Sequence, residues 1–552
     1  FVNSYYRNSG VDSTFSNSIL NLRASSATMV NSSGTIVTVG VGVPRTGHHV
    51  YNGSAWVNEG LLHESEARTN LLPISNNFSS WNHINASRTA STTEISPSGS
   101  VDAFIIKPTV STGTTWVYYG SVINTGVVTT ISTFAKASGK SFLTMSNSNG
   151  TSSYASFNLT TGAVGTVVSG YTANMEDFSN GWYRCSVTTP TGFNERAVFA
   201  VSDTDGGISS AVNGDDGILL YGAQLEAGST PSSYIPTSGS TVTRAAEILT
   251  VLAAKVPYPA ISDYVETTGT ELITNGDFST SDLSQWTAAA GNTLSIVNGR
   301  LRVTRDGSNV TYSGAIAELD VTIGSYYQIT IETIDGSLSA RHRARPLSSG
   351  GYYGNNQPSG TYHFKATHSP LRIDLNAVQS ANTGYFEYDN ISIKEINPPT
   401  ISIQMSGTMT YADEDVFGST NHNGAGQATF YRRTAGPIDY MFGGIQTGTS
   451  RTGQFITRQR ITGAAGSSHV ESSFTAYSPG INVPFKIAAR HGATFINGAV
   501  EGTALTANTT PTALPDLSSR NLQLGYDYMG TISKFVMWDE DIGDTGIASA
   551  SL

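Results

Sequence analysis

The chain of 552 residues is long enough for about three to four domains of ordinary size. With 38% hydrophobic and 10% aromatic residues it can build several cores, and with 13% charged residues it lacks the composition of a disordered chain. The net charge of −11 and the scattered Lys and Arg residues argue against nucleic-acid binding, and the single cysteine excludes an internal disulfide and Cys-rich metal sites.

No apolar run reaches the roughly 18 residues that a membrane helix requires, so we expect no membrane insertion. The first residues, FVNSYY, lack the charged and apolar regions of a signal peptide. A chain with no visible signal and no disulfide fits a protein made in a reducing cytoplasm.

The sequence pattern predicts strands almost throughout. Apolar and polar residues alternate in residues 327–332, 371–375 and 391–394, and similar short runs recur between turn-forming residues. Plausible helices are restricted to residues 245–254 and 543–551. Many short strands with frequent turns predict an all-β chain of tandem β-sandwiches.

Two segments of the chain resemble each other. Residues 70–81 (NLLPISNNFSSW) are echoed by residues 271–279 (ELITNGDFS), which Trp286 follows. Each opening segment is followed, later in the chain, by a predicted apolar strand: residues 217–226 for the first segment and residues 385–393 for the second. The repeat predicts two jelly-roll sandwiches, each with its first and last strands close together.

Proline residues mark the junctions around the second repeat. Pro257 and Pro259 precede it, and Pro398 and Pro399 follow it. Residues 247–269 are therefore either a linker or the first strand of the C-terminal sandwich. In the second case, the second jelly roll is inserted into that sandwich.

The C-terminal part has its own strand pattern. Asn497-Gly498 lies between strand-like runs and predicts a hairpin turn, because both residues tolerate positive φ. Residues 522–525 and 530–538 predict two further strands, and residues 541–551 a closing short helix.

Several of these motifs resemble known families. Residues 275–278 (NGDF), Trp286 and residues 389–393 (DNISI) look like the ends of a family 4/9 carbohydrate-binding module of the jelly-roll kind. Residues 221–228 (YGAQLEAG) and 234–246 are similar to the concatenated carbohydrate-binding-like region of bacteriophage head-spike and tail-fibre proteins. Further parts of that similarity are residues 23–28 (RASSAT), 66–72 (EARTNLL) and 181–184 (GWYR). Residues 400–552 resemble a concanavalin A-like, laminin-G-type sandwich.

These resemblances imply a domain order. Residues 1–69 are expected to be an N-terminal segment for virion docking or oligomerisation. Residues 70–246 and 270–397 are the two jelly rolls, and residues 398–552 are the C-terminal sandwich. Family 4/9-like jelly rolls often hold structural calcium through hard oxygen ligands, and by that resemblance Asp277 and Asp389 are candidate ligands.

Candidate glycan-binding residues are aromatic side chains with nearby amides. Rings stack on the apolar face of a sugar, and amides fix its orientation. One group is Trp116 and Tyr118, although aromatic residues on strands are more often part of a core. The other group lies among glycines that suggest an exposed loop: Tyr352, Tyr353, Asn355 and Gln357.

The sequence offers no catalytic constellation. The acidic clusters lie among turn residues, which indicates solvated loop carboxylates: 203–205, 215–216, 413–415 and 539–541. His48 and His49 are adjacent, and adjacent residues of a strand face opposite sides. Cys185 lies in the strand-like run WYRCSV and is predicted to be a buried thiol rather than a nucleophile. We therefore expect a protein that is not an enzyme.

The resemblance implies a bacteriophage virion protein, a head or tail fibre or spike that adheres to host surface glycans. Its expected partners are other virion proteins, host glycans and further copies of itself, with a trimer favoured. It is expected at the virion surface after synthesis in the host cytoplasm. Two alternatives stay open: a polysaccharide-degrading enzyme with appended binding modules, and a structural decoration protein without a ligand.

Overall fold

The computed structural model describes residues 6–8, 11–13 and 19–552, apart from the following positions: 122, 147–152, 190–193, 257–268, 309–312, 349–350, 379–382, 397–399, 412–426, 438, 447–452, 462–465, 474–475, 478–479, 513 and 516. Pro257, Pro259, Pro398, Pro399 and the acidic cluster 413–415 lie outside the described residues.

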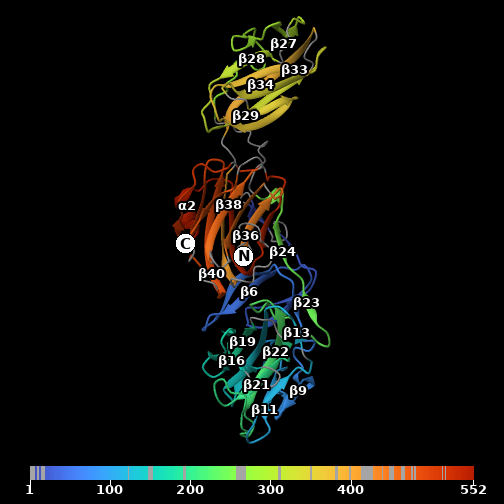
Figure 1. The fold of residues 1–552 in the computed structure, drawn as a ribbon, viewed down its shortest axis with the longest axis vertical. Coiled ribbons are helices and arrows are strands. Elements are labelled where there is room, and N and C mark those ends of the chain that lie inside the picture. The colour runs from blue at the N-terminus through green and yellow to red at the C-terminus, as the bar shows by residue number, and fades with distance from the viewer. Residues whose placement is uncertain are drawn as a thin grey trace.

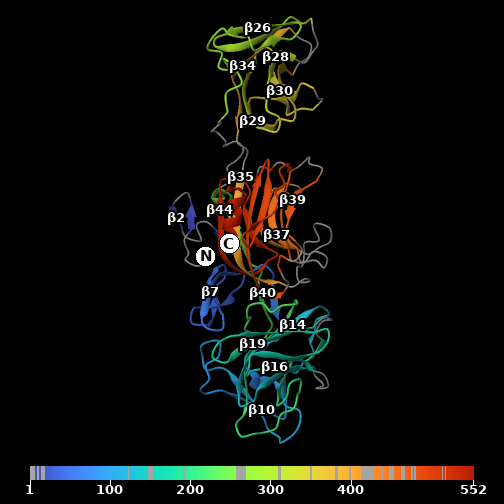
Figure 2. The same ribbon diagram turned by 90° about the vertical axis from the view of Figure 1, so that its left-hand side faces the viewer.

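In the described part of the chain, the regular secondary structure is almost entirely β-strand, which confirms the predicted fold class. Three sandwiches of antiparallel sheets follow one another along the long axis of the molecule (Figures 1 and 2). The described part of the chain contains one α-helix, α2 (Gly543–Ala550), within the segment predicted to end the C-terminal sandwich. None of its helices has the length and apolar character needed to cross a membrane.

The first sandwich is built from two six-stranded sheets with the orders β10-β11-β22-β14-β19-β18 and β17-β16-β15-β21-β12-β9. Its strands are β9 (Asn82–Ile84), β10 (Ala86–Ala90), β11 (Phe104–Pro108), β12 (Trp116–Tyr118), β14 (Thr129–Ser138), β15 (Phe142–Ser146), β16 (Ser153–Asn158), β17 (Ala163–Val167), β18 (Thr172–Asp177), β19 (Trp182–Thr189), β21 (Val198–Ser202) and β22 (Gly217–Ala227). The opening segment lies against the last strand, as predicted, because Leu71 N donates to Leu225 O at 2.7 Å.

The second sandwich has two five-stranded sheets with the orders β25-β28-β33-β30-β31 and β26-β27-β34-β29-β32. Its strands are β25 (Thr287–Ala288), β26 (Asn292–Val297), β27 (Arg300–Arg305), β28 (Ser313–Leu319), β29 (Tyr326–Ile334), β30 (Ala340–Pro346), β31 (Gly354–Gln357), β32 (Gly360–Lys365), β33 (Leu371–Ala377) and β34 (Gly384–Ile396). Here too the opening segment lies beside the last strand, with Leu272 N donating to Ile393 O at 2.9 Å.

The repeated residues have equivalent roles in the two sandwiches. Phe78 and Phe278 are buried, and so are Trp81 and Trp286. The similarity of the two opening segments therefore reflects the same need to fill the core beside the last strand.

The C-terminal sandwich has two seven-stranded sheets, β3-β24-β43-β36-β37-β38-β39 and β42-β41-β40-β35-β44-β7-β6. Its strands are β3 (Ile19–Leu22), β6 (Arg45–Tyr51), β7 (Trp56–Glu64), β24 (Ile248–Val251), β35 (Thr400–Tyr411), β36 (Gln427–Thr434), β37 (Tyr440–Gln446), β38 (Gln454–Arg460), β39 (Ser468–Glu471), β40 (Gly480–Gly492), β41 (Ile496–Val500), β42 (Thr503–Ala504), β43 (Leu522–Tyr526) and β44 (Met529–Trp538).

This sandwich is assembled from distant parts of the chain. Residues 1–69 were expected to be a separate segment, but β3, β6 and β7 are strands of the C-terminal sandwich, and Leu61 is buried in its core. The helix considered for residues 245–254 is wrong, because this segment contains the strand β24. The strand β24 pairs with β43, as an inserted second sandwich requires. The chain leaves the C-terminal sandwich after β7, forms the first sandwich and returns at β24. The residues between β24 and β35 then form the second sandwich. The C-terminal sandwich is consequently the middle lobe in Figure 1.

The expected Asn497-Gly498 turn is wrong. Both residues lie inside β41, and the turn that follows is formed by Glu501 and Gly502, which have φ of 45° and 81°. The Asn497 amide is buried and donates to Asp544 Oδ1 of α2 at 2.6 Å. A tertiary contact thus uses the side chain that the local pattern assigned to a turn.

Candidate functional site

A pocket of about 510 Å³ lies between the first sandwich and the C-terminal sandwich. The β6–β7 hairpin, the end of β18 and residues 231–234 contribute to its lining, together with parts of β35, β40 and β44. Its size falls in the range that is usual for small-ligand sites, about 300–1,000 Å³. It is the candidate functional site.

Three half-buried aromatic residues border this pocket. Tyr51 and Trp56 are cross-strand partners on the β6–β7 hairpin, with ring centroids 5.3 Å apart. The Trp56 ring also meets the edge of Phe178, which follows β18 of the first sandwich, at 5.0 Å. Aromatic surface from two sandwiches therefore joins at one place.

Two adjacent histidines border the pocket as well. The prediction that His48 and His49 face opposite sides assumed a regular strand. The pairing of β6 with β7 shifts on both sides of His48, and Gly47 has a φ of 73°. Such bulges redirect side chains, so neighbouring residues can border the same space.

The Nδ1 atoms of the two histidines have opposite roles in hydrogen bonds. His48 Nδ1 accepts the backbone N–H of Val30 at 3.1 Å, so its proton lies on Nε2. His49 Nδ1 lies 2.8 Å from the Gly47 carbonyl oxygen and must donate to it. Burial, and then the charge of Arg45, lower the pKa of His48 to about 3. His48 is consequently an uncharged hydrogen-bond donor at neutral pH.

Carboxylates and an amide complete the polar lining. Glu59 on β7 accepts a hydrogen bond from the Thr408 hydroxyl at 2.8 Å. Asn482 of the C-terminal sandwich donates to Glu176 of the first sandwich at 3.4 Å. Asp177 is exposed at the end of β18. The pocket thus combines aromatic surface with several hydrogen-bond acceptors.

The loop at the pocket is fixed by buried side chains of β22. Glu226 accepts the Ser232 N–H at 2.9 Å and the Ser232 hydroxyl at 2.6 Å. Gln224 accepts the Ile235 N–H at 2.6 Å. Gln224 and Glu226 belong to the YGAQLEAG motif, so this motif positions the loop.

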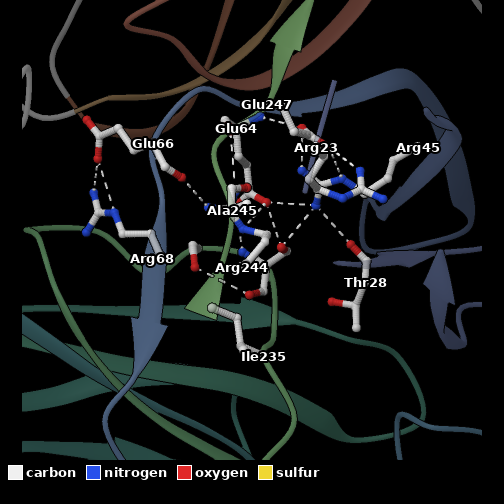
Figure 3. Close-up of polar contacts among 12 residues, drawn as sticks. Arg23, Thr28, Arg45, Glu64, Glu66, Arg68, Ile235, Arg244, Ala245 and Glu247 are labelled. Carbon is white, nitrogen blue, oxygen red and sulfur yellow. Dashed lines mark hydrogen bonds and ion pairs between the residues drawn. The ribbon is translucent and has the colours of Figure 1, made fainter. Parts of the chain in front are cut away.

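Figure 3 shows a network of charged residues that includes Glu64, a residue that also lines the pocket. Arg45 binds Glu247 through two hydrogen bonds, of 3.0 Å from Nε and 2.7 Å from Nη2. It also forms an ion pair with Glu64 at 2.7 Å. Arg23 reaches Glu247 at 2.5 Å, and Arg244 reaches Glu64 at 3.1 Å. The five residues come from the N-terminal segment, from β7 and from the end of the first sandwich.

The electrostatics keep both carboxyl groups ionised. Burial alone would raise the pKa of Glu64, but Arg244 and Arg45 hold it well below its ordinary value. At Glu247, burial likewise acts to raise the pKa, but the charge of Arg45 outweighs it, and the pKa is lowered. Burial lowers the pKa of the neighbouring His63, so this ring is neutral. The network joins the two sandwiches and fixes the pocket between them.

The predicted glycan-binding residues Trp116 and Tyr118 lie on β12. Trp116 is 5% exposed and packs with Val198 and Ala200. Tyr118 is half-buried under the guanidinium of Arg196, 5.5 Å from its ring. The ring of Trp116 therefore belongs to the protein interior and not to a binding surface.

The second predicted group lies at the edge of the second sandwich. Tyr352 is 49% exposed, and Asn355 and Gln357 are exposed on the edge strand β31. Tyr353 instead stacks on Phe364 at 4.3 Å, and its hydroxyl bonds to Thr367. Three of the four predicted side chains thus lie at the surface, although two of them are on a strand and not in the expected loop.

The predicted calcium ligands lie on adjacent chain segments, because Ile391 N donates to Gly276 O at 2.9 Å. Asp277 accepts both the N–H and the hydroxyl of Ser279, and Asp389 accepts the N–H of Asn390. Within the part of the chain that the structure describes, no three His, Cys, Asp or Glu side chains gather as a metal site. Local turns account for both residues, and calcium stays a prediction.

Cys185 is buried on β19, as predicted. The sequence did not single out Tyr51, Trp56 or Phe178. A usable signal was the Asn52-Gly53 pair, which favours a hairpin. A two-residue turn would place Tyr51 opposite Ser54, whereas the loop 52–55 of the structure places Tyr51 opposite Trp56. Nothing in the sequence placed Phe178 beside them.

No protein-family model and no curated protein sequence matches the chain. Among solved structures, it is similar to the N-terminal CBM22-1–CBM22-2 tandem domain of Xyn10C from Paenibacillus barcinonensis, at 12% sequence identity. The alignment covers 59% of this chain and 96% of that chain, with a TM-score of 0.18. At this TM-score, the similarity carries no information about function.

Proposed function

We propose that the pocket between the first sandwich and the C-terminal sandwich binds a glycan, and that the protein is a non-enzymatic fibre or spike component of a bacteriophage virion. The observation that supports the glycan is the joined aromatic surface of Tyr51, Trp56 and Phe178 beside polar side chains.

This combination matches the chemistry of a sugar ring. The C–H groups of a sugar form an apolar face that stacks on an aromatic ring, and its hydroxyls need acceptors around their edge. Glu59, Glu176 and Asp177 are acceptors at the pocket, and His48 is an uncharged donor. A neutral sugar satisfies these groups without bringing a like charge to the carboxylates.

The virion role is supported by the motif residues and by the shape of the chain. The motif residues resemble those of phage head-spike and tail-fibre proteins, and here they fix the loop beside the pocket. The three sandwiches in a row give an elongated molecule, which suits a projecting fibre (Figure 2). Other virion proteins and further copies of the chain are its proposed partners at the virion surface.

The test is a glycan array of neutral bacterial surface oligosaccharides, followed by calorimetric titration of the strongest hit. Trp56→Ala should weaken binding by about tenfold or more, since stacking on one ring is worth roughly 0.5–1.5 kcal/mol beyond its buried area. Tyr526→Ala is the matched control, because Tyr526 is 36% exposed and lies on β43 of the same sandwich.

Unchanged binding by a folded Trp56→Ala variant would reject the pocket as the glycan site. Release of reducing ends from a bound polysaccharide would favour the depolymerase alternative. Immunogold labelling of intact phage particles tests the virion role, and labelling confined to the host cell would contradict it.

A further inference from the structure

The outward face of one sheet of the second sandwich carries a row of arginines. Along β30 the residues Ala340, His342 and Ala344 are buried, so the alternate residues Arg341, Arg343 and Arg345 face outward. On the neighbouring strand β33, Arg372 lies opposite Arg345. Four guanidinium groups thus share one face in a chain whose net charge is −11.

The carboxylates of this face only partly offset these charges. Asp374 accepts hydrogen bonds from Arg345 Nε at 2.9 Å and from Arg372 Nε at 2.8 Å. Glu318 is exposed and lies opposite Arg372 on β28. Among the described residues of these three strands, four guanidinium groups therefore face two carboxylates. The Asp374 carboxylate occupies Arg345 and Arg372, and it shows that arginines of this face can hold a carboxylate by charge-assisted hydrogen bonds.

A buried amide lies on the same face. Asn376 is 1% exposed, and neither Oδ1 nor Nδ2 has a hydrogen-bond partner. It is opposite Arg341 on one side and Ser313 on the other, on the outward side of β33. Arg341 itself donates to the adjacent Ala340 carbonyl at 2.6 Å. A buried amide without partners is costly, and this one lies directly beneath the arginine row.

The edge of the face offers groups that suit a sugar. Tyr352 is 49% exposed, with the Arg343 guanidinium 6.0 Å from its ring. Asn355 and Gln357 are exposed on β31, which pairs with β30. An exposed ring supports stacking, and amides supply neutral hydrogen bonds.

We propose that this arginine face binds a carboxylate-bearing polysaccharide, that is, a chain containing uronic acids or similar acidic sugars. Guanidiniums bind the sugar carboxylates, and Tyr352 stacks on a ring. An open sheet face suits an extended chain, whereas a small molecule is usually enclosed in a pocket. This site lies on a different sandwich from the pocket and takes a ligand of different charge, so it does not rest on the proposed function above.

The test is titration of the full chain with polygalacturonate, with neutral dextran, dextran sulfate and duplex DNA as comparison probes. Polygalacturonate should bind, with an affinity that falls as salt rises, and neutral dextran should not bind at this face. The double variant Arg341→Gln/Arg343→Gln should weaken polygalacturonate binding by about tenfold or more, because charge-assisted hydrogen bonds are lost. Arg300→Gln is the matched control, since Arg300 is a surface arginine of the opposite sheet.

Several results would overturn the proposal. One is an unchanged affinity in the double variant, provided that its thermal unfolding matches that of the parent chain. Another is equal binding of dextran sulfate or DNA, which would show a general anion site. Failure of the pocket is recognised separately, because it changes binding of neutral oligosaccharides and leaves polygalacturonate binding in place.

Discussion

Arg45 and Glu247 are 202 residues apart in the sequence and form an ion pair in the interior, with two hydrogen bonds of 3.0 and 2.7 Å. Arg45 is the first residue of β6 in the C-terminal sandwich. Glu247 directly precedes β24, where the chain returns from the first sandwich to the C-terminal sandwich. The ion pair therefore holds the segment before the first sandwich against the segment that follows it.

Removing one partner should destabilise the protein strongly. Glu247→Gln leaves Arg45 and Arg23 buried with one carboxylate fewer, and breaking a buried pair typically costs about 3–5 kcal/mol. We expect a fall of that size in the free energy of unfolding, measured by urea titration. As the control, Asp215→Asn removes the surface pair with Lys107, where Asp215 is 98% exposed, and should change nothing measurable. A stability loss in Glu247→Gln no larger than in that control would contradict this account of the junction.

Acidification should lower the stability in two steps. Buried histidines have folded pKa values below the ordinary 6.5, at about 4 for His342 and about 3 for His491. Between pH 6.5 and each folded pKa, the histidine is protonated in the unfolded chain and neutral in the folded chain. Stability is therefore lost as the pH falls below about 6.5. Glu64 and Glu247 have folded pKa values below the ordinary 4.5, so their contribution is lost as the pH falls further. The free energy of unfolding measured from pH 8 to pH 3 checks both steps.

The variant His342→Phe isolates one part of the first step. His342 is buried, neither ring nitrogen has a hydrogen-bond partner, and its ring stacks on Tyr362. Phenylalanine keeps the stacking and cannot be protonated, so the loss of about 3 kcal/mol expected between pH 6.5 and 4 should disappear. An unaltered pH profile in this variant would show that His342 does not titrate with folding.

Gly228→Ala should be more damaging than a comparable glycine substitution. At Gly228, φ is 119°, and a Cβ would meet the guanidinium of Arg68, a buried side chain that is paired with Glu66 and would have to move. At Gly239, φ is 122°, and a Cβ would meet nothing within 4 Å. Both alanines carry similar backbone strain of about 1–2 kcal/mol, so the additional loss in Gly228→Ala measures the clash. Equal melting temperatures for the two variants would contradict the close approach of Arg68.

Isolated fragments should differ in their ability to fold. Residues 270–397 contain every buried residue of the second core, so they should unfold cooperatively on their own. Residues 400–552 lack Leu61, Leu249 and Val251, which are buried in the C-terminal core. We expect this fragment to aggregate or to unfold without a cooperative transition, as measured by calorimetry. A stable fragment 400–552 would mean that the N-terminal strands are dispensable.

The Cys185 thiol should be unreactive in the native protein. It is buried on β19, and burial raises its pKa, so the reactive thiolate is suppressed. A thiol reagent such as dithionitrobenzoate should label it in urea and leave it unmodified in native buffer. Rapid native labelling would show local opening of the first sandwich.

The local pattern of the sequence determined the fold class and the repeated module. Alternation along strands such as residues 371–375, and the shared Phe and Trp of the two opening segments, are short-range signals. They report which residues must be buried, and burial follows from hydrophobicity within a few residues. The closing helix could be recognised on the same grounds.

Tertiary structure alone decided where the N-terminal strands pair and where the pocket forms. The strands β3 and β24 complete a sheet with β43. Phe178 contacts Trp56 only because the first sandwich packs against the C-terminal sandwich. Asn497 is a second case in which a distant contact overrides the local pattern, since its side-chain amide donates to Asp544 and the residue does not form a turn. Partners separated by hundreds of residues leave no local periodicity, so the sequence specifies the modules while the packing between them sets the candidate site.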